Sequence, residues 1–348
     1  MPEQPLHAVL LYPRSGFKPE LRSDTLWGTI CWAIRSMYGN ARLEAWLKQH
    51  VDGQPPLLIS SAFLFEETNG AQTFYLPRPS LPLLQEGTPT FEKMKLHKRE
   101  KKVRYLPAET LQKMALGKLS NEQLIQNLRK ELTDSQKLNQ PQQQAESFTH
   151  NTIDRLRGGT LQKDNEAGQL FHDEERFVRG GKVNPADATS EARKKAGIYF
   201  LVQGDAALLD TCFRYLRHMG IGGDRSVGKG VFDHAIVPFA WESPQIPNAA
   251  LSLSLFQPTP DQLAQFVGNP HFSYQLEERR GDVSFGGYGR VQKVRHTFFL
   301  EGSVFPYAAN QPWGSIFDVR PKDAIEKKFV PHPVYQYGYA LTLPFQFV

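Results

Sequence analysis

The residues best suited to carry chemistry lie in a glycine-rich stretch at residues 220–230 (GIGGDRSVGKG), where five of eleven residues are glycine. A glycine amide can approach an anion closely, and glycine adopts the positive φ angles that aim several amides at one group of oxygens. Arg225, Ser226 and Lys229 stand between the glycines and add two cations and a hydroxyl. The stretch therefore predicts a phosphate-binding loop, with a purely structural turn as the alternative.

A nucleotide-hydrolysing P-loop must also be weighed, because residues 223–229 fit the pattern GxxxxGK. Gly230, however, stands where a P-loop has the Ser or Thr that holds Mg²⁺. The predicted loop also runs from a helix into a strand, whereas a P-loop runs from a strand into a helix. We therefore expect neither nucleotide hydrolysis nor a cofactor.

Local patterns predict the elements that hold this loop. A strand over residues 197–202 precedes Asp205, which begins a helix whose apolar residues recur at helical spacing. Gly220 is expected to end that helix, because helices commonly end at a glycine with a positive φ. A strand over residues 231–237 follows the loop.

The N-terminal residues show a similar order. An apolar strand is expected over residues 7–12, and Ser23 or Asp24 is placed to cap a helix that ends at Gly39. Further strands are expected over residues 57–65 and 73–76.

The second half of the chain repeats the sequence of strand, helix, strand, glycine loop and strand. The segments that carry it are residues 251–256, 260–267, 272–276 and 281–289. The repeated order favours an α+β fold of two ferredoxin-like (RRM-like) domains over a Rossmann fold. We assign residues 1–240 to the first domain, with an insertion at about residues 77–195, and residues 241–348 to the second.

The insertion shows little sustained periodicity. A helix is expected over residues 107–132, and the glutamine-rich run at residues 135–144 is expected to be mobile. Residues 92–104 hold seven Lys and Arg against two Glu, which suggests a ligand-facing surface or simply a solvated, charged loop.

Composition limits the class of protein. The chain of 348 residues has a net charge of +5 and a pI near 9.0, which suggests a polyanionic partner. No apolar run is long enough for a membrane span, and the N-terminus lacks a secretory signal, so we expect a cytoplasmic protein. Cys31 and Cys212 fall in amphipathic helical patterns, and we expect neither a disulfide nor a metal site.

The spacing of Gly220, Gly222, Gly228 and Gly230 resembles the glycine-rich loop of the RAMP superfamily, the RNA-binding proteins of CRISPR effector complexes. Other segments resemble the family of the fourth subunit of the type III-A CRISPR (Csm) complex. These segments are residues 22–34 (RSDTLWGTICWAI), 151–171, 301–305 (EGSVF) and 338–345 (GYALTLPF). The glutamine-rich run departs from the family pattern and leaves the local structure of the insertion open.

The resemblance implies a non-catalytic subunit that caps the 5′ handle of the crRNA. It also implies docking to the large polymerase-like subunit and the first backbone subunit, with no membrane and no small-molecule substrate. The residues expected to bind RNA are Ser23, Asp24, Thr25, His150, Asn151, Arg155, Arg157, Gly158, Gly220, Gly222, Gly223, Arg225, Ser226, Gly228, Lys229 and Gly230.

Two other functions remain open at this point. A crRNA-processing endoribonuclease of the same superfamily would need an acid/base group, for which His150 and Asp154 are the nearest candidates. Nothing in the sequence places a partner beside either residue, and Asp154 is more simply explained as the partner of a neighbouring arginine. The third function is a scaffold that contacts only protein and presents its basic insertion to an acidic partner.

Overall fold

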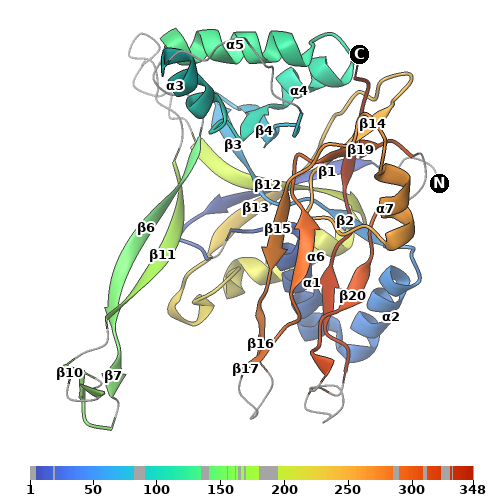
Figure 1. Ribbon diagram of the computed structural model, residues 1–348. Coiled ribbons are helices and arrows are strands. Elements are labelled where there is room, and N and C mark those ends of the chain that lie inside the picture. The colour runs from blue at the N-terminus through green and yellow to red at the C-terminus, as the bar shows by residue number, and fades with distance from the viewer. Residues whose placement is uncertain are drawn as a thin grey trace.

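The computed structural model (Figure 1) describes most of the chain. The described residues are 5–18, 20–81, 91–134, 141–154, 156–160, 162–163, 166–167, 170–179, 195–284, 290–308, 312–322, 330 and 332–347. The fold is a mixture of helices and mainly antiparallel strands, in agreement with the predicted α+β class. Among the helices described, none combines the length and the apolar character needed to span a bilayer.

A seven-stranded antiparallel sheet forms the centre of the molecule. Its strands follow the order β13 (Phe232–Pro238), β1 (Leu6–Pro13), β12 (Lys195–Gly204), β3 (Phe63–Thr68), β4 (Ala71–Pro77) and β5 (Tyr105–Pro107), while β2 (Leu57–Ile59) pairs with β12. The single strand predicted over residues 57–65 is wrong. Between β2 and β3, the Ser60 amide bonds to Leu201 and the Ser61 amide to Leu253, which breaks the strand.

Helices α1 (Ser23–Tyr38) and α6 (Ala206–Met219) follow β1 and β12 and cover one face of this sheet. The four strands β13, β1, β12 and β3 with these two helices have the β-α-β-β-α-β order of a split unit. The helix α6 begins directly after Asp205, as predicted, and the Asp205 side chain caps it by accepting from the Leu208 amide at 2.9 Å.

Both faces of the central sheet are buried, and β1 shows this most clearly. Val9 and Leu11 pack with α1 and α6, whereas Ala8 and Leu10 pack into a second core on the opposite face. All four are at most 1% exposed. This double burial explains why the strand is continuously apolar in the sequence.

The C-terminal part adds a smaller sheet in the order β19 (Val304–Pro306), β14 (Ala249–Ser252) and β22 (Thr342–Phe345), with α7 (Pro260–Phe266) beside it. Three hairpin pairs extend it: β15 (Leu276–Arg279) with β18 (His296–Phe299), β16 (Asp282–Ser284) with β17 (Arg290–Gln292), and β20 (Ile316–Asp318) with β21 (Tyr335–Tyr337). The strand predicted over residues 272–276 begins only at Leu276, and before it Ser273 forms an isolated bridge to Val304. Residues 285–289 of the second predicted glycine loop lie outside the described residues.

The two halves of the chain share their cores. Tyr337 and Tyr339 pack with α1 and with α2 (Asn40–Val51), and Leu251 and Leu343 pack against the opposite face of the central sheet. The surfaces between the halves are therefore held in a defined relative position.

The insertion contains more regular structure than its sequence suggested. Helices α3 (Phe91–Glu100), α4 (Ala108–Ala115) and α5 (Asn121–Asp134) lie together at the top of Figure 1. The single helix predicted over residues 107–132 is wrong, because residues 116–120 interrupt it and Gly117 has a positive φ of 68°. Much of the basic run at residues 92–104 is helical and does not form a loop.

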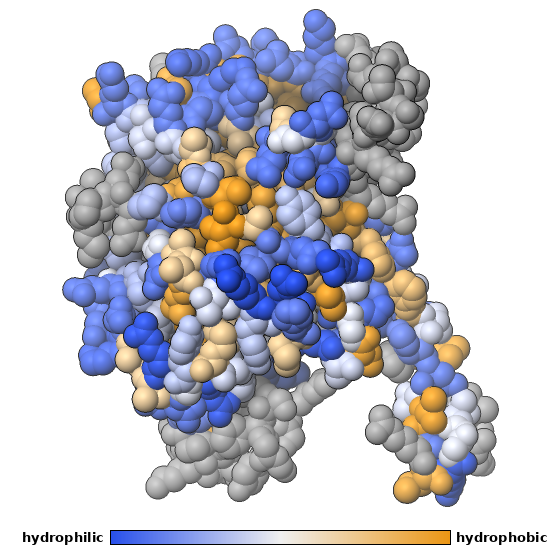
Figure 2. All heavy atoms as spheres, turned by 180° about the vertical axis from the view of Figure 1, so that it is seen from behind, coloured by the Kyte–Doolittle hydropathy of each residue, from blue (hydrophilic) through white to orange (hydrophobic). Residues whose placement is uncertain are grey.

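A long antiparallel hairpin, here called the arm, follows these helices. It pairs β6 (Gln142–Asn151) with β11 (Leu170–Arg179) and carries two short pairs at its tip, β7 (Ile153–Asp154) with β8 (Gly159–Thr160) and β9 (Gln162–Lys163) with β10 (Glu166–Ala167). The arm stands clear of the body in Figure 1 and again from behind in Figure 2. Residues 142–144 of the glutamine-rich run are in β6, contrary to the expected mobility, and residues 135–140 lie outside the described residues.

Candidate nucleic-acid interface

The glycine-rich loop joins α6 to β13, so it does run from a helix into a strand as predicted. Gly222 shows why glycine is needed: its φ is +87°, and a Cβ there would lie 1.9 Å from the Lys18 carbonyl oxygen. Gly230 has a φ of +71° and would place a Cβ 2.0 Å from the Ile221 oxygen. Gly220 and Gly228 also have positive φ. The loop is thus folded tightly onto residues 16–18.

Much of the loop's backbone is already hydrogen-bonded within the protein. The Gly223 amide donates to the Lys18 oxygen at 2.7 Å, and the Gly230 amide donates to the Gly16 oxygen at 2.9 Å. In the part of the chain that the structure describes, the amides of Gly222, Asp224, Arg225 and Ser226 have no acceptor. These four amides lie at or just before the start of a short 3₁₀ turn (Arg225–Val227) and can donate to an anion.

The two cations of the loop differ in their surroundings. Lys229 Nζ lies 2.8 Å from Glu175 Oε2, whose side chain is only 5% exposed. Lys18 below the loop is likewise paired with Asp173 on the arm and with Asp224, the latter at 2.8 Å. Lys229 therefore ties the loop to the base of the arm.

Arg225 is exposed, and no carboxylate among the described residues pairs with it. Ser226 beside it is exposed as well. The side chains of Arg225 and Ser226 and the four amides without acceptors are therefore the groups of the loop that can bind a phosphate.

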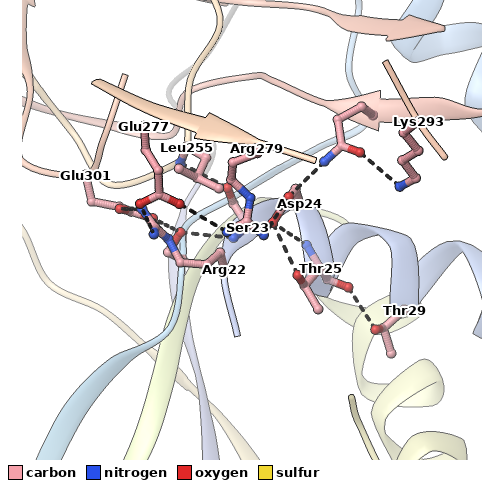
Figure 3. Close-up of polar contacts among 12 residues, drawn as sticks. Arg22, Ser23, Asp24, Thr25, Thr29, Leu255, Glu277, Arg279, Lys293 and Glu301 are labelled. Atoms are coloured by element: carbon pink, nitrogen blue, oxygen red, sulfur yellow. Dashed lines mark hydrogen bonds and ion pairs between the residues drawn. The ribbon is translucent and has the colours of Figure 1, made fainter. Parts of the chain in front are cut away.

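Ser23 is placed differently from the prediction. Arg22 is the residue before the helix, and Ser23 begins α1 and is completely buried. Its Oγ accepts from the Leu255 amide at 3.0 Å, and its own amide donates to Ser61 Oγ at 2.9 Å (Figure 3). Ser23 therefore joins the two halves of the chain and has no surface left to face RNA.

Asp24 is also occupied within the protein. It accepts from the Thr25 amide at 2.8 Å and from Gln336 Nε2 at 2.8 Å, and it lies 3.1 Å from Arg279 Nη2 (Figure 3). The negative charge of Asp24 does not suit it to bind phosphate. Its carboxylate instead holds the side chains of Gln336 and Arg279 from the C-terminal half. Thr25 is half-buried on the same turn of α1.

Arg22 completes this junction between the halves. It makes a two-pronged contact with Glu301, with Nε 2.8 Å from Oε1, and a further contact with Glu277 at 3.2 Å. Burial lowers the pKa of Arg22, but the attraction of Glu301 and Glu277 more than offsets burial, so the pKa is raised and the arginine stays charged. The ion-paired network of Arg22, Glu277 and Glu301, here called the joint, therefore connects the two halves of the chain.

A cavity of about 570 Å³ opens between the loop, α1 and the C-terminal hairpins. Its lining includes four cationic side chains, Arg225, Arg279, Arg280 and Lys293, and two anionic ones, Asp24 and Asp282. Lys293 is hydrogen-bonded to Gln336 at 3.1 Å, and burial lowers its pKa. Arg280 is exposed, donates to Gln292, and has no carboxylate partner within the described residues.

The sequence did not point to Arg280 or Lys293 as site residues. They flank the β16-β17 pair far along the chain. The sequence feature nearest to them is the second glycine-rich stretch, residues 281–289, which itself contains no Lys or Arg. The tertiary fold brings them to the same cavity as Arg225.

The remaining predicted residues lie on the arm, away from this cavity (Figure 1). His150 and Asn151 end β6, Arg155 lies outside the described residues, and Gly158 has a φ of +68° with open space around it. Arg157 is exposed over 83% of its side chain. The structure therefore separates the predicted residues into two groups.

Asp154 at the arm's tip behaves as a structural carboxylate. Its Oδ1 accepts from the amides of Leu156 and Arg157 at 2.9 and 3.3 Å, and its Oδ2 lies 3.8 Å from Arg157 Nε. The prediction that Asp154 partners a neighbouring arginine is confirmed. Across the described residues, no group of three His, Cys, Asp or Glu side chains has the arrangement needed to hold a metal ion.

The sequence is similar to known Csm4 proteins. Residues 247–345 match the family described as the CRISPR Csm4 C-terminal domain. The chain is 29% identical over 342 residues to the CRISPR system Cms protein Csm4 of Thermococcus onnurineus (strain NA1), covering 97% of this chain and 95% of the relative.

Two solved structures share the fold over nearly the whole chain. One is a crystal structure of a Csm1-Csm4 cassette in complex with cA4, with a TM-score of 0.56, 19% identity and coverage of 99% of this chain and 98% of the other. The other is a Csm3-Csm4 subcomplex of the type III-A CRISPR-Cas interference complex, with a TM-score of 0.55, 17% identity and coverage of 98% and 99%. The predicted resemblance is confirmed.

Proposed function

We propose that this chain, which resembles Csm4 in sequence over 97% of its length, is a non-catalytic RNA-binding subunit of a type III-A CRISPR interference complex. It caps the 5′ handle of the crRNA. The observation that carries the RNA-binding part of the proposal is Arg225, an exposed cation with no carboxylate partner among the described residues. It lies beside four loop amides without acceptors and lines a cavity that has more cationic than anionic side chains.

Such an arrangement suits phosphate better than base edges. Amides and a guanidinium both donate hydrogen bonds, and an arginine can bind two phosphate oxygens at once. Phosphate contacts fix the position of a nucleic acid without reading its sequence. The loop then positions the handle.

Docking of Csm1-type and Csm3-type subunits is the second part of the proposal. Csm1 and Csm3 accompany Csm4 in the two crystal structures that share this fold. A subunit that meets the large polymerase-like subunit and the first backbone subunit lies at one end of the complex, where the 5′ handle has to be held.

The arm provides a second contact with RNA in this proposal. Arg155 and Arg157 serve as phosphate or stacking ligands, Gly158 permits close approach, and His150 and Asn151 lie just before them. The exposure of Arg157 supports this role.

Two ferredoxin-like domains, divided near residue 240, form the framework of the proposed subunit. The strand and helix order of the first half supports the assignment there. In the second half, the order β19-β14-β22 with α7 after β14 supports it.

The groups near the proposed RNA path support the proposal that the subunit is non-catalytic. The loop lacks the hydroxyl that would hold Mg²⁺, and the Asp154 carboxylate is engaged by backbone amides. His150 is the residue to test. If the purified protein cuts repeat RNA at one position, and His150→Ala abolishes the cut without changing affinity, the chain is a processing nuclease and this part of the proposal fails.

Salt-dependent binding of a fluorescent 5′-handle RNA tests the RNA-binding proposal. Arg225→Ala should weaken binding and flatten the slope of log affinity against log salt by about 0.7, the value for one lost phosphate contact on a single strand. Lys229→Ala should change the slope much less, because Glu175 already neutralises Lys229.

Arg14→Ala is the matched control, since Arg14 is exposed, pairs with Asp233 and does not line the cavity. An unchanged slope in Arg225→Ala would overturn the assignment of the loop. Failure of the wild type to bind handle RNA, alone and with its partner subunits, would leave the protein-only scaffold as the function.

A further inference from the structure

We propose that the cavity between the two halves holds one unpaired nucleobase, stacked on Trp32, so that the subunit selects single-stranded RNA. The inference rests on the proposed RNA-binding function and adds a base-binding residue to it. Trp32 was not among the residues that the sequence singled out.

Trp32 differs from the other tryptophans of the chain in its exposure. It is 59% exposed, whereas Trp27, Trp46 and Trp313 are 3 to 4% exposed and Trp241 is partly buried in a core. Trp32 also lines the cavity. An exposed indole is costly in water, and base stacking is a means of covering it.

The ring of Trp32 is held in place from within its own helix. The guanidinium of Arg35 lies 5.0 Å from the ring centroid, and Arg35 Nε is fixed by Asn40 at 3.0 Å. A cation over the ring contributes attraction and leaves the residue largely accessible. A base that stacks on Trp32 therefore meets an aromatic surface whose orientation is already set.

The face of α1 that leads to Trp32 carries small side chains. Thr25, Gly28, Thr29 and Trp32 recur at helical spacing, and all four line the cavity. Gly28 lies inside the helix, where glycine is less favourable than alanine. A Cβ on Gly28 would meet nothing within 4 Å, so no neighbour among the described residues requires a glycine there. The absent side chain instead leaves room above the helix.

The size and charge of the cavity fit a nucleotide. A volume of about 570 Å³ is within the range of small-ligand pockets, roughly 300–1,000 Å³. Arg225 and Arg280 stand at the same cavity, exposed and without carboxylate partners in the described part of the chain. A base on Trp32 thus leaves its phosphates near two available cations.

Selection for unpaired RNA follows from this geometry. A base inside a duplex is stacked on its neighbours on both faces, so it cannot also stack on an indole. A splayed, single-stranded nucleotide can.

Tryptophan fluorescence gives a direct test, because Trp32 is the most exposed indole. Single-stranded handle RNA should quench the wild type and Trp241→Phe equally, and it should leave Trp32→Phe nearly unquenched. The same RNA annealed to a complement should not quench. Quenching that persists in Trp32→Phe would overturn the proposal.

Affinity measurements provide an independent test. Trp32→Ala should weaken single-strand binding about 5- to 150-fold, the range for loss of one stacked base. Gly28→Ala should raise the melting temperature, because alanine favours the helix, and yet weaken binding, because its methyl group fills space above α1. A purely structural glycine would not give these opposite signs.

The outcomes separate this inference from the proposed function. If RNA binds with a salt slope that depends on Arg225, but Trp32→Ala and Gly28→Ala bind like the wild type, the base site is wrong and the phosphate site stands. If Trp32→Ala loses a partner subunit while RNA affinity is unchanged, Trp32 is a protein contact and the base site is again wrong. Absence of any RNA binding would instead defeat the proposed function.

Discussion

The junction between the two halves, here called the inner end, and the part of the cavity lined by Arg225 and Arg280, here called the outer end, both contain arginine, but they differ in how those arginines are neutralised. At the inner end, Arg22 and Arg279 are bound by Glu301, Glu277 and Asp24. At the outer end, Arg225 and Arg280 are exposed and have no carboxylate partner among the described residues. The difference shows that a count of cations does not locate a phosphate site, because paired cations have already satisfied their hydrogen bonds within the protein.

Lys229 shows the same point within a single loop. It is four residues from Arg225, and the sequence predicts the same role for both. Glu175 neutralises Lys229, which turns a predicted ligand into an anchor for the arm. The comparison thus distinguishes charged residues that hold the protein together from those that are available to a ligand. Substitutions at three places test this distinction.

The largest effect is expected at the inner end. Arg22→Ala leaves Glu301, whose side chain is 11% exposed, as an unpaired buried charge, and this should lower the free energy of unfolding by about 3–5 kcal/mol. Arg14→Ala is the control of the same residue type, because its pair with Asp233 is exposed and should contribute about 1 kcal/mol or less. Urea denaturation measures both. If Arg22→Ala and Arg14→Ala lose similar amounts of unfolding free energy, the ion pairs of Arg22 do not hold the two halves together.

The second change concerns His50, a buried histidine behind the inner end. Its Nε2 accepts from Trp27 Nε1 at 3.2 Å, so the ring must be neutral with its proton on Nδ1, which bonds the Trp46 oxygen at 3.0 Å. Burial lowers the pKa of His50 to about 4 from its ordinary value of 6.5. The protonated ring would lose the Trp27 bond.

The sign of the pH dependence follows from this lowered pKa. Between pH 6.5 and 4 the unfolded chain binds a proton that the folded chain does not, so the free energy of unfolding falls as the pH falls. Over this window the loss from His50 should be about 3 kcal/mol. Denaturation of the wild type and His50→Gln at several pH values measures it. The two curves should converge toward acid pH, and parallel curves would contradict the pKa shift.

The smallest effect separates the anchored and free parts of the glycine-rich loop. Gly222 and Gly228 have nearly equal φ angles, +87° and +83°, but only at Gly222 would a Cβ meet the backbone of Lys18. Alanine at Gly228 should cost about 1–2 kcal/mol from the backbone conformation alone. Alanine at Gly222 should cost about 1–3 kcal/mol more, because of the clash. Equal losses in unfolding experiments would show that the loop is not held against residues 16–18 in solution.

The sequence predicts much of the local structure. The positions of β1, α1, α6, α7 and the glycine-rich loop are predicted correctly to within a few residues, and the family resemblance is confirmed. Each of these depends on residues close together in the chain, whose spacing records the helix or strand directly. The arm is missed because an exposed two-stranded ribbon buries little, so β6 and β11 show no apolar alternation.

The tertiary structure decided which of the predicted residues are available to RNA. Ser23 is buried by Leu255, Asp24 is held by Gln336, and Lys229 is neutralised by Glu175. These partners are 232, 312 and 54 residues away along the chain. Electrostatic pairing and burial depend on residues that are close in space. A local sequence pattern therefore predicts the helix, strand or loop that carries a charged residue, but it does not identify the partner that neutralises the charge. Arg225 and Trp32 stand out only after the fold has placed every partner.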